Sequence, residues 1–186
     1  MPFPTDPPGR HRAIAGIFTE RVQAVSDWDV PAPVEGWAAR DVVRHLVEWF
    51  PGFLHAGAGI ELPTGPPVDD DPVAAWRTFS DGVQALLDDP ASADLVVHNR
   101  HIGDVPVPRA VSQFFTADVF MHSWDLARAT GQDETLDPER CAAMLEGMEP
   151  MDELLRSSGQ YGPRVPVPAD ADPQTRLLAF IGRDPR

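Results

Sequence analysis

Hydrophobic residues recur every three or four positions over most of the chain, and this spacing is typical of amphipathic α-helices. The first such stretch runs from about His11 to Ser26, after a start that we expect to be frayed, and the second runs from about Trp37 to Phe50. Because proline lacks a backbone N–H, Pro51 is expected to kink or end the second helix. Proline-rich segments between the periodic stretches indicate connecting loops.

Capping residues set the limits of the later helices. Four further helices are expected at residues 72–89, 108–130, 138–157 and 173–181. Asp71 and Asp137 are predicted N-caps, each followed by a proline at the first helical position, and Gly131 is a predicted C-cap. The fifth helix is expected to continue through Pro150. A β-branched run before Gly103 predicts extended chain or a small hairpin ahead of the fourth helix.

These elements predict an all-α protein. A chain of 186 residues fits a single domain, residues 1–186, and can bury its own core without disulfides or a structural metal. Helices of this length in a short chain pack most simply as an antiparallel four-helix bundle. We therefore expect a bundle with a short extended or hairpin excursion and extra helices at the C-terminus.

Charge and composition restrict the partners. A net charge of −14 argues against nucleic acid and anionic membranes, which both attract basic surfaces, so small molecules are the expected partners. The apolar runs are shorter than the roughly 20 residues of a membrane span. The segment MPFPTDPPGR lacks the features of a signal peptide, and we expect a cytoplasmic protein. All 15 basic residues are arginine, which excludes lysine-dependent chemistry such as a Schiff base.

The chain's clearest chemical pattern is formed by Asp118, His122 and Asp125. Spacings of four and three residues place these side chains on one face of the fourth predicted helix. A carboxylate and an imidazole one turn apart can bind a single ion, and an imidazole from a neighbouring helix would complete a three-ligand site. His45 is the best donor for it. Asp125 competes with Asp118 as the carboxylate ligand, because both share the face of His122.

Other interpretations of the same residue types stay open. An Asp and a His at helical spacing often form only a surface hydrogen bond, and a His on a half-apolar helix often lies in the core. His98 and His101 are interpreted as loop residues, with the mouth of a site as the alternative. Cys141 excludes an internal disulfide and is expected to be a small buried residue. Core packing is favoured over an aromatic ligand cage for the tryptophans, which are Trp28, Trp37, Trp49, Trp76 and Trp124.

Three segments carry a resemblance to a known family. GWAARDVVRHLV, DVFMHSWDLARATGQ and QYGPRVPVPADADPQTRLLAFIGRDP resemble the actinobacterial metal-binding branch of the DinB-like superfamily, relatives of the mycothiol-dependent maleylpyruvate isomerase N-terminal domain. The likeness covers nearly the whole chain. It implies an up-down-down-up core and a divalent metal held by His45, Asp118 and His122. The isomerase has a glutamate where this chain has Asp118, so the metal would lie closer to this helix or be bound less well. The resemblance implies an outer or capping role for Asp125.

The resemblance also implies a function. It suggests a transferase or isomerase that uses a small thiol, mycothiol, on a small electrophile. Zn²⁺ is the expected ion, with Ni²⁺, Mn²⁺ and Fe²⁺ left open, and a homodimer is also left open. Two neutral imidazoles and one carboxylate leave a divalent ion with net positive charge and an open position, where a thiol can lose its proton. The alternative is a non-catalytic metal-binding or stress-associated protein, whose site would be closed by a fourth ligand.

Overall fold

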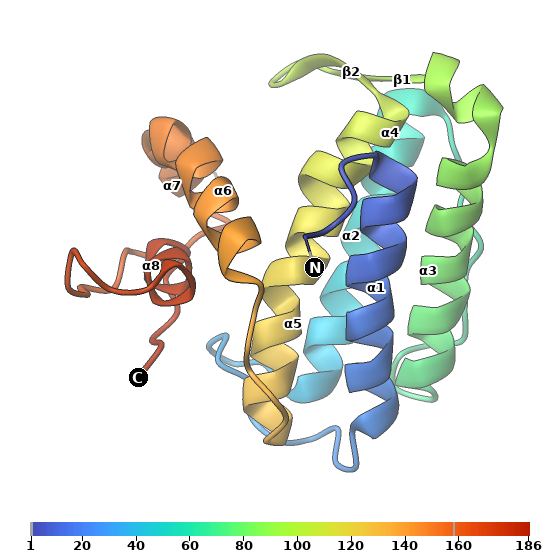
Figure 1. Ribbon diagram of the computed structural model, residues 1–186. Helices are drawn as coiled ribbons and strands as arrows, with labels where there is room; N and C mark the ends of the chain where they lie inside the picture. Colours follow the sequence, from blue (N-terminus) through green and yellow to red (C-terminus); the bar gives the residue numbers. More distant parts are fainter. Residues whose placement is uncertain (1, 158) are drawn as a thin grey trace.

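Long helices dominate the computed structural model, which describes residues 2–157 and 159–186. The bundle consists of α1 (Pro7–Ala24), α2 (Ala39–Ala58), α3 (Pro72–Asp88) and a composite helix made of α4 (Val107–Ala110), the π-helical η2 (Val111–Thr116) and α5 (Ala117–Thr130). In Figure 1, α1 and α5 run in one direction, and α2 and α3 run in the other. The predicted all-α class is confirmed.

The helix α1 begins earlier than predicted. Asp6 caps it by accepting the backbone N–H of Gly9 at 2.8 Å, and Pro7 and Pro8 occupy the first turn. Proline is well suited there, because the first N–H groups of a helix have no intrahelical acceptor. The expectation of a frayed start is therefore wrong, although the Asp-Pro-Pro run carries the same capping signal as the later helices.

The helix α2 continues through Pro51 and ends at Ala58, followed by Gly59 in the left-handed conformation with φ of 66°. Pro51 was expected to kink or end the helix, and of these two expectations the end is wrong. Phe50 and Leu54, on either side of the proline, are both fully buried. Their packing offsets the hydrogen bond that proline cannot make, which costs about 3 kcal/mol in a helix interior.

The composite helix matches the predicted fourth helix closely, and Gly131 follows it with φ of 68°. Its π-helical segment was not predicted. A π-turn contains an extra residue, which rotates the helical face that follows it. Phe115 lies in this segment, is fully buried, and stacks on Phe50 with ring centroids 4.7 Å apart. The face that carries Asp118 begins directly after this turn.

The remaining elements flank the bundle. The predicted hairpin is formed by β1 (Val96–Asn99) and the antiparallel β2 (Gly103–Pro106), after the short 3-10 helix η1 (Pro90–Asp94). The C-terminal helices are α6 (Pro138–Met148), the 3-10 turn η3 (Glu149–Met151), α7 (Asp152–Ser157) and α8 (Pro173–Phe180). The expected fifth helix does begin at Pro138 and reach Ser157, but it is not one α-helix, because a 3-10 turn at Pro150 separates α6 from α7. Figure 1 shows α6 and α8 together on one side of the bundle, where they pack against each other.

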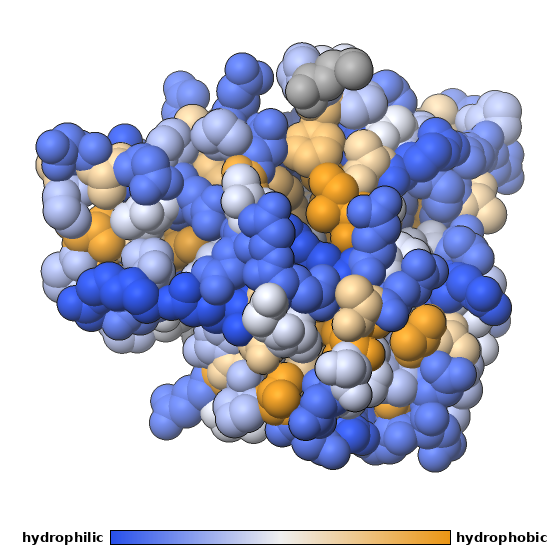
Figure 2. Space-filling model, turned by 60° about the horizontal axis from the view of Figure 1, so that its bottom comes forward, coloured by the Kyte–Doolittle hydropathy of each residue, from blue (hydrophilic) through white to orange (hydrophobic). Residues whose placement is uncertain are grey.

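Aromatic side chains fill the core. Trp76 and Phe18 are fully buried and meet edge to face, with centroids 4.6 Å apart. Figure 2 shows the lower end of the molecule, where hydrophilic residues cover most of the face and hydrophobic ones gather in small groups. No helix in the described ranges has the length and apolar composition needed to cross a membrane.

Candidate metal centre

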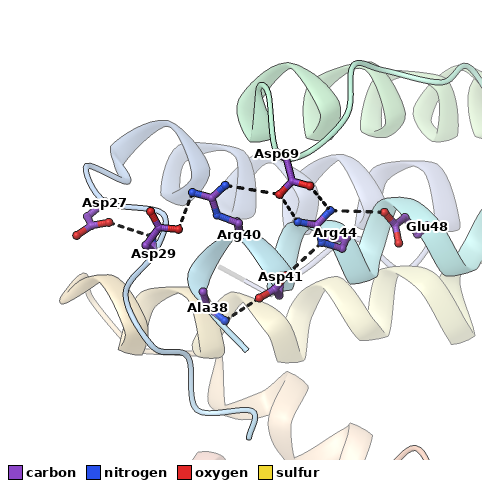
Figure 3. Close-up of polar contacts among 8 residues, drawn as sticks. All are labelled: Asp27, Asp29, Ala38, Arg40, Asp41, Arg44, Glu48 and Asp69. Carbon is purple, nitrogen blue, oxygen red and sulfur yellow. Dashed lines mark hydrogen bonds and ion pairs between the residues drawn. The ribbon is translucent and has the colours of Figure 1, made fainter. Parts of the chain in front are cut away.

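A polar network fixes the first turns of α2, the helix that carries His45 (Figure 3). Asp41 accepts the backbone N–H of Ala38 at 2.8 Å, and Arg44 donates to Asp41 at 3.1 Å and to Asp69 at 2.6 Å. Arg40 approaches the same Asp69 carboxylate at 3.6 Å. Exposed ion pairs contribute little individually. Because these ion pairs share partners, the network as a whole ties the start of α2 to the segments on both sides of the helix.

His45, Asp118 and His122, called the triad below, meet between α2 and α5. One ligand atom of each lies within 4.8 Å of the others. His45 Nε2 lies 3.0 Å from Asp118 Oδ2, and His122 Nε2 lies 3.5 Å from Asp118 Oδ1. The side chain of His45 is 32% exposed, against 7% for His122, so the triad opens to solvent on the α2 side. The triad could hold a metal ion.

The Asp118 carboxylate is prepared to be an anionic ligand. Burial raises its pKa, but the charge of His122 and the hydrogen bond from His45 lower it by more, so its pKa falls below the ordinary value. Trp49 Nε1 donates a further hydrogen bond to Oδ2 at 3.0 Å. An ionised carboxylate is the form that a divalent ion requires. Burial lowers the pKa of His122, but the charge of Asp118 and the hydrogen bond with Asp125 raise it above its ordinary value, so a bound ion would have to displace the Nε2 proton of His122.

His122 is oriented from its outer side by Asp125. Asp125 Oδ2 lies 2.8 Å from His122 Nδ1, and the Asp125 side chain is fully buried. Burial raises the pKa of Asp125, but hydrogen bonding with His122 and Arg183 lowers it below its usual value. Since an ionised carboxylate can only accept, Nδ1 carries the proton and Nε2 faces Asp118. This is the arrangement in which a carboxylate orients a metal-binding histidine.

Two tryptophans form walls of the triad. Trp37 stacks on His122 with centroids 5.8 Å apart and lies 5.2 Å from the ring of His45. Trp49 holds Asp118, as described above. Both tryptophans also pack against the hydrophobic core, as expected, so they serve the core and the triad together. Trp49 follows His45 by four residues, so helical spacing could have identified it, whereas Trp37 precedes the helix and gives no periodic signal.

Two residues of the C-terminal segment also reach the site. Arg183 donates to Asp125, 58 positions away in the chain. Burial and the nearby charge of Asp118 raise the pKa of Tyr161 to about 12, so its phenol stays protonated. Neither residue was identified from the sequence. Both lie in segments that carry the family likeness, but no helical spacing relates them to the triad.

The other candidate residues lie outside the triad. His98 is exposed on β1 with Nδ1 2.9 Å from Asp104 Oδ1, and His101 is exposed in the hairpin turn. Cys141 is buried in α6, and burial raises the pKa of its thiol to about 12, which makes it a poor nucleophile. Within residues 2–157 and 159–186, the triad is the one group of three or more such side chains with ligand atoms close enough to share an ion.

Two cavities lie elsewhere on the molecule. One of about 310 Å³ is lined by residues including Trp124 and Arg128, and one of about 240 Å³ by residues including Ile17 and Arg21. Neither is lined by a member of the triad.

Comparison with known proteins shows relatives without a stated activity. Two uncharacterized proteins from two strains of Mycobacterium tuberculosis are each 29% identical to this chain over 162 residues, which covers 84% of the chain and 85% of the relative. No family model matches the chain, and no solved structure matches it. The likeness therefore extends along most of the chain, while the site has to be interpreted from its own geometry.

Proposed function

We propose that the protein binds one divalent ion through His45, Asp118 and His122, and that it uses a small thiol to transform a small electrophile by transfer or isomerisation. The observation that carries the metal site is the convergence of two imidazoles and one carboxylate within 4.8 Å. Such a set of donors suits Zn²⁺, and it also suits Ni²⁺, Mn²⁺ and Fe²⁺.

The thiol chemistry is supported by three features. A bound divalent ion would supply Lewis acidity, which favours the thiolate form of a small thiol near neutral pH. His45 is partly exposed, so a small molecule can approach the triad from that side. The raised pKa of the chain's own Cys141 makes it unsuitable as the nucleophile, so the thiol has to come from outside.

The opposed directions of α1 and α5 against α2 and α3 support the DinB-like assignment, and with it the choice of mycothiol as the thiol. In that arrangement two helices of opposite direction, α2 and α5, present ligands to one point. Bundle cores commonly hold metals in this way, with side chains from facing helices.

We predict that mycothiol added to cobalt-loaded protein produces a sulfur-to-cobalt charge-transfer band. Thiolate is a soft, strongly held ligand and should occupy an open position beside the three protein ligands. Absorption spectroscopy measures the band, and S-methylated mycothiol is the matched control because it has no thiolate. An unchanged spectrum at saturating thiol, with cobalt still bound, would refute the thiol-dependent function and leave metal binding intact.

A non-catalytic metal-binding protein is the second candidate. It is favoured by the burial of two of the three ligands, since the side chains of Asp118 and His122 are only 17% and 7% exposed. In that function the ion would stabilise the bundle or be sensed by it.

We predict that the metal-free protein melts in a single cooperative transition. The buried aromatic core around Phe115 and Trp76 needs no ion, and a chain of this size buries enough apolar surface to fold alone. Circular dichroism of chelator-treated and metal-loaded protein tests this, with a higher melting temperature expected for the loaded form. A metal-free chain that lacks helical signal at low temperature would instead support a structural ion.

A further inference from the structure

Arg183 makes a two-pronged contact with Asp125, the residue behind His122. Its Nε donates to Asp125 Oδ1 at 2.8 Å, and its Nη2 donates to Oδ2 at 3.0 Å. The Asp125 side chain is fully buried, and that of Arg183 is 15% exposed. Paired N–H donors of this kind fix the plane of a carboxylate as well as its charge.

The two hydrogen bonds from Arg183 fix the position in which the Asp125 carboxylate accepts a hydrogen bond from His122. Without Arg183, the buried carboxylate would have one fixed partner and could rotate about its side-chain bond. With Arg183 in place, Oδ2 is held at 2.8 Å from His122 Nδ1. The ring of His122 is thereby held with Nε2 toward Asp118.

The backbone before Arg183 is shaped to deliver this side chain. Gly182 has φ of 86°, and a Cβ there would lie 3.0 Å from the backbone of Gly162. The Arg183 N–H donates to the carbonyl of Leu178 at 2.9 Å, which closes the end of α8. A glycine is thus required at position 182 both for its conformation and for the close crossing of the two backbone segments.

We infer that Arg183 is a positioning residue of the metal site. It acts through Asp125 on His122, so that metal binding by side chains of the bundle depends on a residue delivered by the C-terminal segment. The inference rests on the proposed metal site. Its competitor is a purely structural role, in which the ion pair only holds the C-terminal segment against α5.

A double-mutant cycle in the full-length protein separates the two roles. Arg183→Gln is expected to weaken metal binding about 10- to 100-fold, the usual effect of losing an outer partner of a ligand. Asp125→Asn should weaken it to a similar extent. The double variant should be no worse than Asp125→Asn alone, because Arg183 acts through Asp125. Arg183→Lys should bind metal more tightly than Arg183→Gln, since lysine keeps the positive charge but not the paired N–H donors.

Arg176→Gln is the matched control, because Arg176 lies on α8 but its side chain is 44% exposed and pairs only distantly with Glu149. Its metal affinity should equal that of the parent protein. Independent losses that multiply in the double variant, or an Arg183→Gln variant that binds metal normally, would overturn the positioning role.

A metal-independent measurement keeps the test valid if the parent protein binds no ion. The Nδ1 proton of His122 should give a slowly exchanging, downfield proton resonance in the metal-free protein, because it is buried against Asp125. Arg183→Gln should shift or broaden that resonance, while the backbone amide spectrum remains that of a folded protein. If the parent protein binds no ion but Arg183→Gln still shifts or broadens the His122 resonance, only the proposed function is refuted. An unchanged resonance in Arg183→Gln refutes the positioning role.

Discussion

Replacing His122 with alanine is expected to abolish stoichiometric binding of a divalent ion. The substitution removes a ligand, so the loss should exceed the roughly 100-fold typical of an outer partner. His45→Ala should have the same effect from the opposite helix. Elemental analysis after chelator treatment and reloading measures the result, with about one ion per chain expected for the parent protein.

His98→Ala is the matched control, because His98 is an exposed histidine paired with Asp104 on the hairpin. It should bind the ion as the parent does. The folded state of each variant is checked by circular dichroism, since His122 packs against Trp37. A folded His122→Ala variant that takes up the ion at the parent's stoichiometry would show that the triad is not the site.

The candidate ligands were predictable because their signal is largely local. Asp118 and His122 are one helical turn apart, so any helix over this segment places them together. The structure brings His45 to them from α2, as expected. The choice of His45 rested on its position in a helical run and on the family likeness, since spacing within one helix says nothing about which helix is its neighbour.

The outer parts of the site were not predictable in this way. Arg183 reaches Asp125 only because α8 ends in a turn at Gly182, and nothing in the spacing of residues 125 and 183 indicates that contact. Trp37 was placed at the start of the second predicted helix, but it precedes α2, so helical spacing does not relate it to the triad. Both contacts depend on how separate segments pack, and that is decided by the whole core.

The two prolines within predicted helices show that the effect of a proline depends on tertiary packing as well as on local sequence. At Pro150 the α-helix changes to a 3-10 turn before it resumes, whereas Pro51 lies within a continuous α-helix. The difference follows burial: Phe50 and Leu54 beside Pro51 are fully buried, and both Pro150 and Met151 are exposed. A proline is tolerated in a helix when neighbouring side chains gain enough from the core, and the sequence alone does not reveal that gain.

His11 couples the stability of the fold to pH at a point separate from the triad. It is fully buried on α1, and its Nδ1 lies 3.0 Å from Thr116 Oγ1 in the π-helical turn. Its Nε2 is buried and has no hydrogen-bond partner among the described residues. Burial, and then the charge of Arg12, lower the pKa of His11 to about 4, against a partial opposing effect of Asp88.

Acid should therefore destabilise the protein through His11. The unfolded chain takes up this proton near pH 6.5, while the folded protein resists it until about pH 4, so protons favour unfolding between these values. The contribution of neutral His11 to the free energy of unfolding is complete above pH 6.5 and is lost as the pH falls toward 4. The expected loss is about 3 kcal/mol, since one pKa unit corresponds to roughly 1.4 kcal/mol.

The His11→Asn variant isolates this effect, because asparagine can keep a hydrogen bond to Thr116 and does not titrate. Its free energy of unfolding should fall less steeply than that of the parent between pH 6.5 and 4, when both are measured by urea denaturation. Titrating groups that do not interact with His11, such as His122, are present in both proteins and cancel in the difference. Parallel pH profiles for the two proteins would mean that His11 accepts a proton in the folded state as readily as in the unfolded chain, and that the burial of its ring carries no electrostatic cost.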